Sequence, residues 1–128
     1  MTVHPVDHWY AYMQSHDAAA LDAMLADDVV FESPVVHTPQ RGKAITLKYL
    51  GAASMVLGGA GFRYVGEWRA DNSAILEFET EIDGISINGI DMIWWSDAGQ
   101  IERFKVMVRP LKAINMLHTM MGAKLAAA

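Results

Sequence analysis

Asp91 is the residue whose type and position point most clearly to chemistry. In an extended segment, side chains alternate between two faces, so the face of Asp91 is otherwise made of apolar residues and glycine: Ile85, Ile87, Gly89, Ile93 and Trp95. An unpaired carboxylate is costly to bury, so such a group raises its pKa or finds a partner. A carboxyl with a raised pKa can serve as a general acid and base. The alternative is a structural acid that bonds Trp9, Ser33 or a water and holds the core together.

Three histidines could add to this chemistry or hold a metal. His37 lies between Pro34 and Pro39, where it is either a second acid–base group or a solvated loop residue. His4 and His8 have the i, i+4 spacing of a helical metal pair. No third ligand is near them in sequence, and Pro5 interrupts the geometry, so we expect neither a metal nor another cofactor.

The elements that must position these residues follow from periodicity and turn signals. The expected helices are 6–14, 18–25, 43–57 and a last one from Pro110 to about Lys124; the expected strands are 29–33, 62–70, 73–82, 85–95 and 101–109. Residues 35–41 are predicted to be a loop. The run Gly58-Gly59-Ala60-Gly61 is either a plain connection, which we favour, or a hinge beside a ligand entrance.

Helices first and a long antiparallel meander afterwards predict an α+β fold. The helices are expected to lie on one face of a strongly curved sheet, so that a cone encloses a pocket, and the chain 1–128 is expected to form one domain. The last helix could close the pocket or extend a dimer.

Alternation on the last strand separates the two faces of the sheet. Phe104, Val106 and Val108 belong inside with Asp91, which leaves the basic residues of that strand outside. The outer face of the preceding strand carries Ile90, Met92 and Trp94. Such an apolar stripe predicts a homodimer in which a second copy covers it.

Composition excludes several functions. Ten Lys and Arg against fifteen Asp and Glu give a formal charge of −5 without a basic run, which disfavours nucleic acid and anionic membrane surfaces. Cysteine is absent, so disulfides and thiolate chemistry are excluded. The beginning MTVHPVDHWY has no signal-peptide pattern, and no apolar run is long enough to span a bilayer, so we expect a cytoplasmic protein.

Several stretches resemble the SnoaL-like and ketosteroid isomerase-like branch of the NTF2-like superfamily. They are Ala26 to Pro34, Gly42 opening a helix, Ile90-Asp91 on a long strand, and Gly99-Gln100-Ile101 after its turn. The resemblance spans Val6 to Val108 and implies the cone fold, with the last helix as an addition. This fold hosts isomerases, cyclases, dehydratases, epoxide hydrolases and binding modules.

The resemblance also implies roles for individual residues. Asp91 falls where ketosteroid isomerases keep a protonated aspartate and SnoaL-type cyclases keep their acid–base aspartate. Ser33 falls where the isomerases place the carboxylate that moves the proton, and a serine hydroxyl cannot replace that base near neutral pH. Trp9 falls close to the tyrosine that donates to the oxyanion. Dehydratases of the superfamily pair His with Asp, the role considered for His37.

The sequence therefore predicts a pocket for a small, mostly apolar carbonyl compound, with Asp91 as its polar anchor. The expected contacts of this compound are Trp9, Met13, Phe31, Ser33, Ile93, Trp95, Phe104, Val106 and Val108. Proton-transfer catalysis of isomerase or cyclase type, without a cofactor, is the leading function. A non-catalytic ligand-binding module and a structural dimer with a filled cavity are the alternatives.

Overall fold

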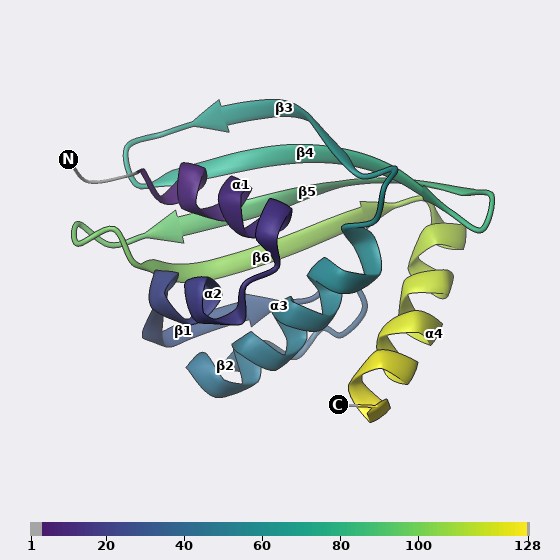
Figure 1. Cartoon of the computed structure of the whole chain (residues 1–128), viewed down its shortest axis with the longest axis horizontal. Helices are drawn as coiled ribbons and strands as arrows, with labels where there is room; N and C mark the ends of the chain where they lie inside the picture. The colour runs from purple at the N-terminus through teal and green to yellow at the C-terminus, as the bar shows by residue number, and fades with distance from the viewer. Residues whose placement is uncertain (1–3, 128) are drawn as a thin grey trace.

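The structure is a computed structural model that describes residues 4–127 and consists of a curved six-stranded sheet with four helices. Figure 1 shows the first three helices across one face of the sheet and the fourth beside them at one end. In chain order the elements are α1 (Pro5–Ser15), α2 (Ala18–Met24), β1 (Leu25–Glu32), β2 (Gln40–Arg41), α3 (Lys43–Leu57), β3 (Arg63–Arg69), β4 (Ser73–Ile82), β5 (Ile85–Trp95), β6 (Ile101–Arg109) and α4 (Leu111–Ala127).

The sheet has the order β2-β1-β6-β5-β4-β3. Strands β3 to β6 form the predicted antiparallel meander, whereas β1 pairs with β6 in parallel. Sequence periodicity gave no sign of this pairing, because β1 lies far from β6 along the chain. The α+β cone predicted from the sequence is confirmed.

Two of the predicted boundaries around β1 are wrong. The strand begins at Leu25 rather than Val29. The prediction missed its first residues because Asp27 and Asp28 are exposed and lie where the pairing with β6 is irregular, so they do not follow the pattern of a buried strand. The predicted loop 35–41 ends in the short strand β2, which pairs with Val30 and Phe31.

Local signals explain where the helices begin. The Asp17 side chain accepts a hydrogen bond from the Ala19 amide and caps α2. The Pro110 carbonyl accepts hydrogen bonds from the amides of Ala113 and Ile114, so Pro110 occupies the position immediately before α4. Ala113 and Leu117 of α4 are buried, and this helix packs against α3 and the ends of β5 and β6.

The core lies between the inner face of the sheet and the helices. Burial on β5 alternates as predicted, with Ile87, Gly89, Asp91, Ile93 and Trp95 buried. Packing explains why residue 89 is a glycine: a Cβ there would meet Phe78 Cζ at 2.5 Å and the Met107 carbonyl oxygen at 2.6 Å. Among the described residues, no helix combines the length and apolar composition that crossing a membrane requires.

Candidate active site around Asp91

Asp91 occupies the middle of the sheet, on its inner face. Its neighbours across the two adjacent strands are Leu76 on β4 and Val106 on β6, both buried. The residue is only 6 % exposed. The predicted position of the carboxyl, inside an apolar core, is therefore confirmed.

A hydrogen-bonded chain of three side chains fixes this carboxyl. The Trp9 indole N–H on α1 donates to the Tyr64 hydroxyl oxygen at 2.7 Å, and the Tyr64 hydroxyl donates to Asp91 Oδ2 at 2.6 Å. An indole nitrogen can only donate, so the direction of the chain is set from Trp9 toward Asp91. Helix α1 and strands β3 and β5 thus each contribute one member.

The pKa of Asp91 is raised to about 7. Burial disfavours the carboxylate and outweighs the opposing effect of the Tyr64 hydrogen bond and of the nearby Trp9 N–H. The pKa of Tyr64 is also raised, by burial and by the neighbouring Asp91 carboxyl, so its hydroxyl keeps its proton. Asp91 can therefore donate or accept a proton near neutral pH, while Tyr64 remains a donor.

The cavity beside Asp91 is small. It has a volume of about 20 Å³ and is lined by Trp9, Met13, Leu50, Ala53, Ser54, Leu57, Phe62, Phe78, Asp91, Phe104 and Val106. That space suffices for one water molecule and is far below the size of an organic ligand. Ser54, the other polar residue of its lining, shares a hydrogen bond of 2.8 Å between its Oγ and the Tyr12 hydroxyl.

The structure brings together only part of the predicted contact set. Trp9, Met13, Phe104 and Val106 line the cavity with Asp91. Phe31 and Ile93 are buried in the surrounding core and do not line it. Trp95 lies at another end of the sheet, where its ring meets His4 edge to face at 5.0 Å.

Ser33, His37 and Val108 lie together in a different place, a surface groove beside the loop after β1. The Ser33 hydroxyl accepts hydrogen bonds from the Val35 and Val36 amides and so belongs to a turn. His37 is exposed, and no hydrogen bond joins it to Asp91 within the described part of the chain. The structure therefore offers no contact for the second acid–base role considered for His37.

His4 has a structural contact: its Nδ1 caps α1 by accepting from the Val6 amide. Residues 4–127 contain no group of three or more His, Asp or Glu side chains placed to hold a metal ion.

Tyr64 is the residue of the site that sequence reasoning missed. The strand was predicted, but a β-bulge between Tyr64 and Gly66 reverses its alternation, so the faces of its residues could not be assigned by parity. The available signal was the aromatic pair Phe62 and Tyr64 at the start of the strand, before the bulge.

The outer face of the sheet has the predicted apolar stripe of Ile90, Met92 and Trp94, all partly exposed. Strongly exposed Trp68 and Met107 extend it. Arg103 lies 4.5 Å above the Trp94 ring and pairs with Glu32, as expected for an outward-facing arginine.

The curved sheet of this structure, with Asp91 buried beneath the helices, has the architecture of an NTF2-like cone. The sequence model of the SnoaL-like domain matches residues 6–104, and the chain belongs to this family. A steroid delta-isomerase from Pseudomonas aeruginosa is similar in structure, with 30% sequence identity, a TM-score of 0.87, and coverage of 96% of this chain and 90% of that one.

Two further solved structures resemble the chain. An uncharacterised bacterial protein with a cystatin-like fold from Silicibacter pomeroyi has 26% identity and a TM-score of 0.86, with 94% of this chain and 84% of that one covered. A putative polyketide cyclase from Sinorhizobium meliloti has 17% identity and a TM-score of 0.63, with 80% and 93% covered, and shows the fold alone. A comparison with curated protein sequences gave no match.

Proposed function

We propose that the protein binds a small, mostly apolar carbonyl compound beside Asp91 and catalyses a proton transfer on it without a cofactor. Because the cavity in this structure holds only about 20 Å³, binding requires lining side chains such as Met13 to move aside. The observation that carries this proposal is the buried Asp91 carboxyl, which borders an otherwise largely apolar cavity and has a pKa of about 7. The family and the similarity to a steroid delta-isomerase support an isomerase or cyclase reaction.

The reaction needs only one acid–base group. The Asp91 carboxylate removes a proton from the carbon beside the carbonyl, and the electron pair of the broken C–H bond moves onto the carbonyl oxygen as an enolate. In an isomerase, the carboxylic acid returns the proton to another carbon of the conjugated enolate. In a cyclase, the enolate carbon attacks a second carbonyl carbon of the same molecule, and Asp91 protonates the resulting alkoxide.

A test uses cyclohex-3-en-1-one, whose isomerisation gives a conjugated enone with a distinct ultraviolet absorbance. We expect turnover by the wild type and a loss of about 100-fold or more in kcat/KM in Asp91→Asn, the range that general acid–base catalysis supplies. Asp28→Asn, at an exposed position of β1, is the matched control and should retain turnover. Full activity in a folded Asp91→Asn variant would show that Asp91 is not the acid.

The rival function is a ligand-binding module without turnover. It is favoured by one observation: Ser33, at the position expected for a second acid, is held in a turn outside the cavity. Binding of the ketone with no conversion, and no deuterium uptake beside its carbonyl in heavy water, would support this alternative.

We also propose that the protein is a homodimer in which a second copy covers the outer sheet face. The partly exposed stripe of Ile90, Met92 and Trp94, continued by Trp68 and Met107, supports this arrangement.

A further inference from the structure

Strand β3 brings Tyr64 and Glu67 to the same face of the sheet. Residues directly opposite one another on antiparallel strands point to one face. Tyr64 lies opposite Phe78, which is fully buried on the inner face. Glu67 lies opposite Leu76, which is fully buried on that face too. A separation of three residues would put the two side chains on opposite faces of a regular strand, and the β-bulge between Tyr64 and Gly66 removes this difference.

Glu67 is hydrogen-bonded to helix α1 through Tyr10. The Tyr10 hydroxyl donates to Glu67 Oε1 at 2.6 Å, and Arg69 Nε donates to the other carboxylate oxygen, Oε2. The Arg69 guanidinium also lies 3.6 Å from the Asp7 carboxylate of α1. We call these four residues, Asp7, Tyr10, Glu67 and Arg69, the α1/β3 clamp. Burial and the bond to Glu67 raise the pKa of Tyr10, and the Arg69 bond lowers the pKa of Glu67, so the hydroxyl stays a donor and the carboxylate an acceptor.

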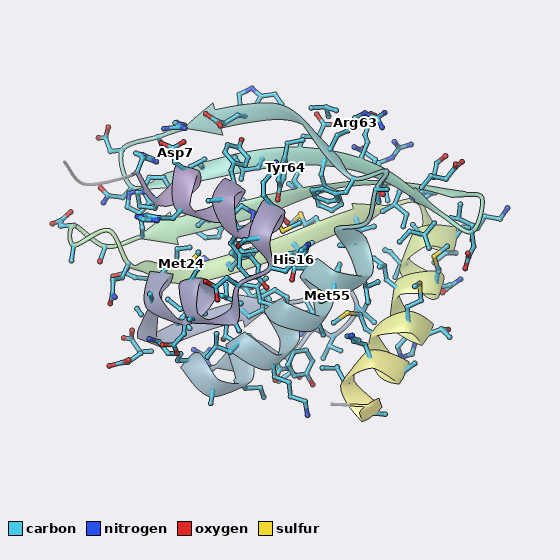
Figure 2. The ribbon with its side chains drawn as sticks, viewed as in Figure 1. Asp7, His16, Met24, Met55, Arg63 and Tyr64 are labelled. Carbon is cyan, nitrogen blue, oxygen red and sulfur yellow. The ribbon has the colours of Figure 1, made fainter. Side chains whose placement is uncertain are left out.

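The α1/β3 clamp meets the candidate active site at the ring of Tyr64, which Figure 2 shows beside α1. The Tyr10 ring lies edge-on against the Tyr64 ring, with centroids 5.1 Å apart, and the Phe62 ring packs against it in the same manner at 5.0 Å. Trp9, the residue before Tyr10, donates to the Tyr64 hydroxyl. Two consecutive residues of α1 therefore hold this tyrosine, one at its ring and one at the hydroxyl that donates to Asp91.

The charged members of the α1/β3 clamp add little to the stability of the fold. The side chains of Arg69 and Glu67 are 38 % and 32 % exposed and that of Asp7 is 56 % exposed, and water and salt screen ion pairs in such places. Their effect on geometry is larger, because a hydrogen bond weakens steeply when its donor is misaligned. The bond of 2.6 Å from Tyr64 to Asp91 is therefore sensitive to how firmly the Tyr64 ring is held.

We propose that Tyr10 and Glu67 are positioning residues, which hold the Tyr64 ring so that its hydroxyl donates to Asp91. Neither residue lines the cavity beside Asp91, so both act through Tyr64. The effect on reaction rate rests on the proposed proton transfer, whereas the effect on the Asp91 carboxyl does not. The bulge of β3 then has a role in the site, because it lets Glu67 face Tyr10 from the same side of the strand as Tyr64.

Two substitutions of Glu67 test the α1/β3 clamp by their difference. Glu67→Leu removes the acceptor for Tyr10, whereas Glu67→Gln removes the same charge and keeps an oxygen that can accept the bond. The charge effect on the Asp91 titration, followed by ¹³C NMR of its carboxyl carbon, is thus common to both variants. The midpoint in Glu67→Leu should lie about 0.3 to 0.5 pH unit above that in Glu67→Gln, a part of the roughly 1 unit that one whole hydrogen bond represents. Equal midpoints would overturn the proposal.

Tyr10→Phe gives a second test, because it removes the hydroxyl without changing charge or ring. The Asp91 midpoint should rise in the wild-type background and stay unchanged in the Tyr64→Phe background, where no hydroxyl remains to be positioned. A shift that persists in Tyr64→Phe would contradict the proposal. So would a Tyr10→Phe variant that unfolds at lower urea concentration but titrates as the wild type does, since Tyr10 would then only stabilise the fold. This cycle decides the matter should Glu67→Leu fail to fold.

Turnover of cyclohex-3-en-1-one separates this proposal from the proposed function. The pH dependence of kcat/KM reports the pKa of the essential base in the free enzyme. Its rise should therefore move to higher pH in Glu67→Leu than in Glu67→Gln, by the same amount as the NMR midpoint. A profile identical in the two variants would show that the α1/β3 clamp does not act on the reacting acid. If the wild type converts no ketone, the proposed function fails, while the NMR midpoints still decide whether Tyr10 and Glu67 position Tyr64.

Discussion

The Tyr64 hydroxyl donates to Oδ2 of Asp91 at 2.6 Å, and this leaves the two carboxyl oxygens unequal. Because the indole of Trp9 occupies a lone pair of the Tyr64 oxygen, the tyrosine proton is directed toward the acid. Oδ2 is therefore an acceptor in both protonation states of Asp91. The proton that Asp91 gains or loses belongs on Oδ1, which we infer to be the reacting atom.

Tyr64→Phe should raise the pKa of Asp91 further above about 7, because the lost hydrogen bond favours the carboxylate. The titration of the Asp91 carboxyl carbon, followed by ¹³C NMR, measures this change. Tyr49→Phe is the control, since Tyr49 packs near Phe31 and its hydroxyl has no hydrogen bond within the described residues. An unchanged midpoint in Tyr64→Phe would contradict the proposed hydrogen bond.

The stability of the fold should fall as pH rises from about 4 to about 7. Asp91 has an ordinary pKa of 3.8 when unfolded and about 7 when folded, so in this window the folded state holds a proton that the unfolded state has lost. The difference amounts to about 4 kcal/mol at pH 8 relative to pH 4. Urea unfolding across this range measures it.

Asp91→Asn isolates the contribution of this one group to the pH dependence. Glu32 and Glu67, whose pKa values are lowered mainly by hydrogen bonds from Arg103 and Arg69, lose their stabilising effect as the pH falls and so act in the opposite direction. Their effects are common to both proteins and cancel in the difference. A difference curve that stays flat between pH 4 and 7 would show that Asp91 is not buried as described.

Gly89→Ala should destabilise the protein by about 2 kcal/mol, because the new methyl group meets the Phe78 ring and the Met107 carbonyl below 3 Å. Gly122→Ala, in open space on α4, should instead stabilise it by about 0.5 kcal/mol. Urea midpoints of the two variants provide the measurement. Equal midpoints would show that the sheet has room at Gly89.

Met92→Lys should convert the proposed dimer to a monomer, because an unpaired ammonium group would be buried in the centre of the stripe. Light scattering after size-exclusion chromatography at micromolar concentration measures the mass. Met55→Lys, the same substitution at an exposed position of α3, controls for the change in charge and should leave the dimer intact. A wild type that is monomeric at this concentration would refute the dimer.

Alternation predicted the fold and the position of Asp91 well, because β5 and β6 pair regularly through most of their length and each has one buried face. The same rule could not place Tyr64, since the bulge after it shifts the register with β4. Pairing across the sheet determines a bulge, and no local pattern encodes it.

The extent of the cavity was beyond sequence reasoning for a different reason. Phe104 and Val106 were correctly placed inside, but whether their neighbours fill the interior depends on side-chain packing in three dimensions. Ser33 and His37 were grouped with the site through resemblance and loop position, whereas the turn at Ser33 directs this loop to another groove.

The parallel pairing of β1 with β6 has a consequence for how the molecule is made. Residues 25–32 have no partner strand on that side until 101–109 have been synthesised, so the barrier to folding includes closing a long loop. Asp91 gains its neighbour Val106 from the same late strand. The strand that pairs with β1 and the strand that flanks Asp91 on that side are thus one and the same, β6.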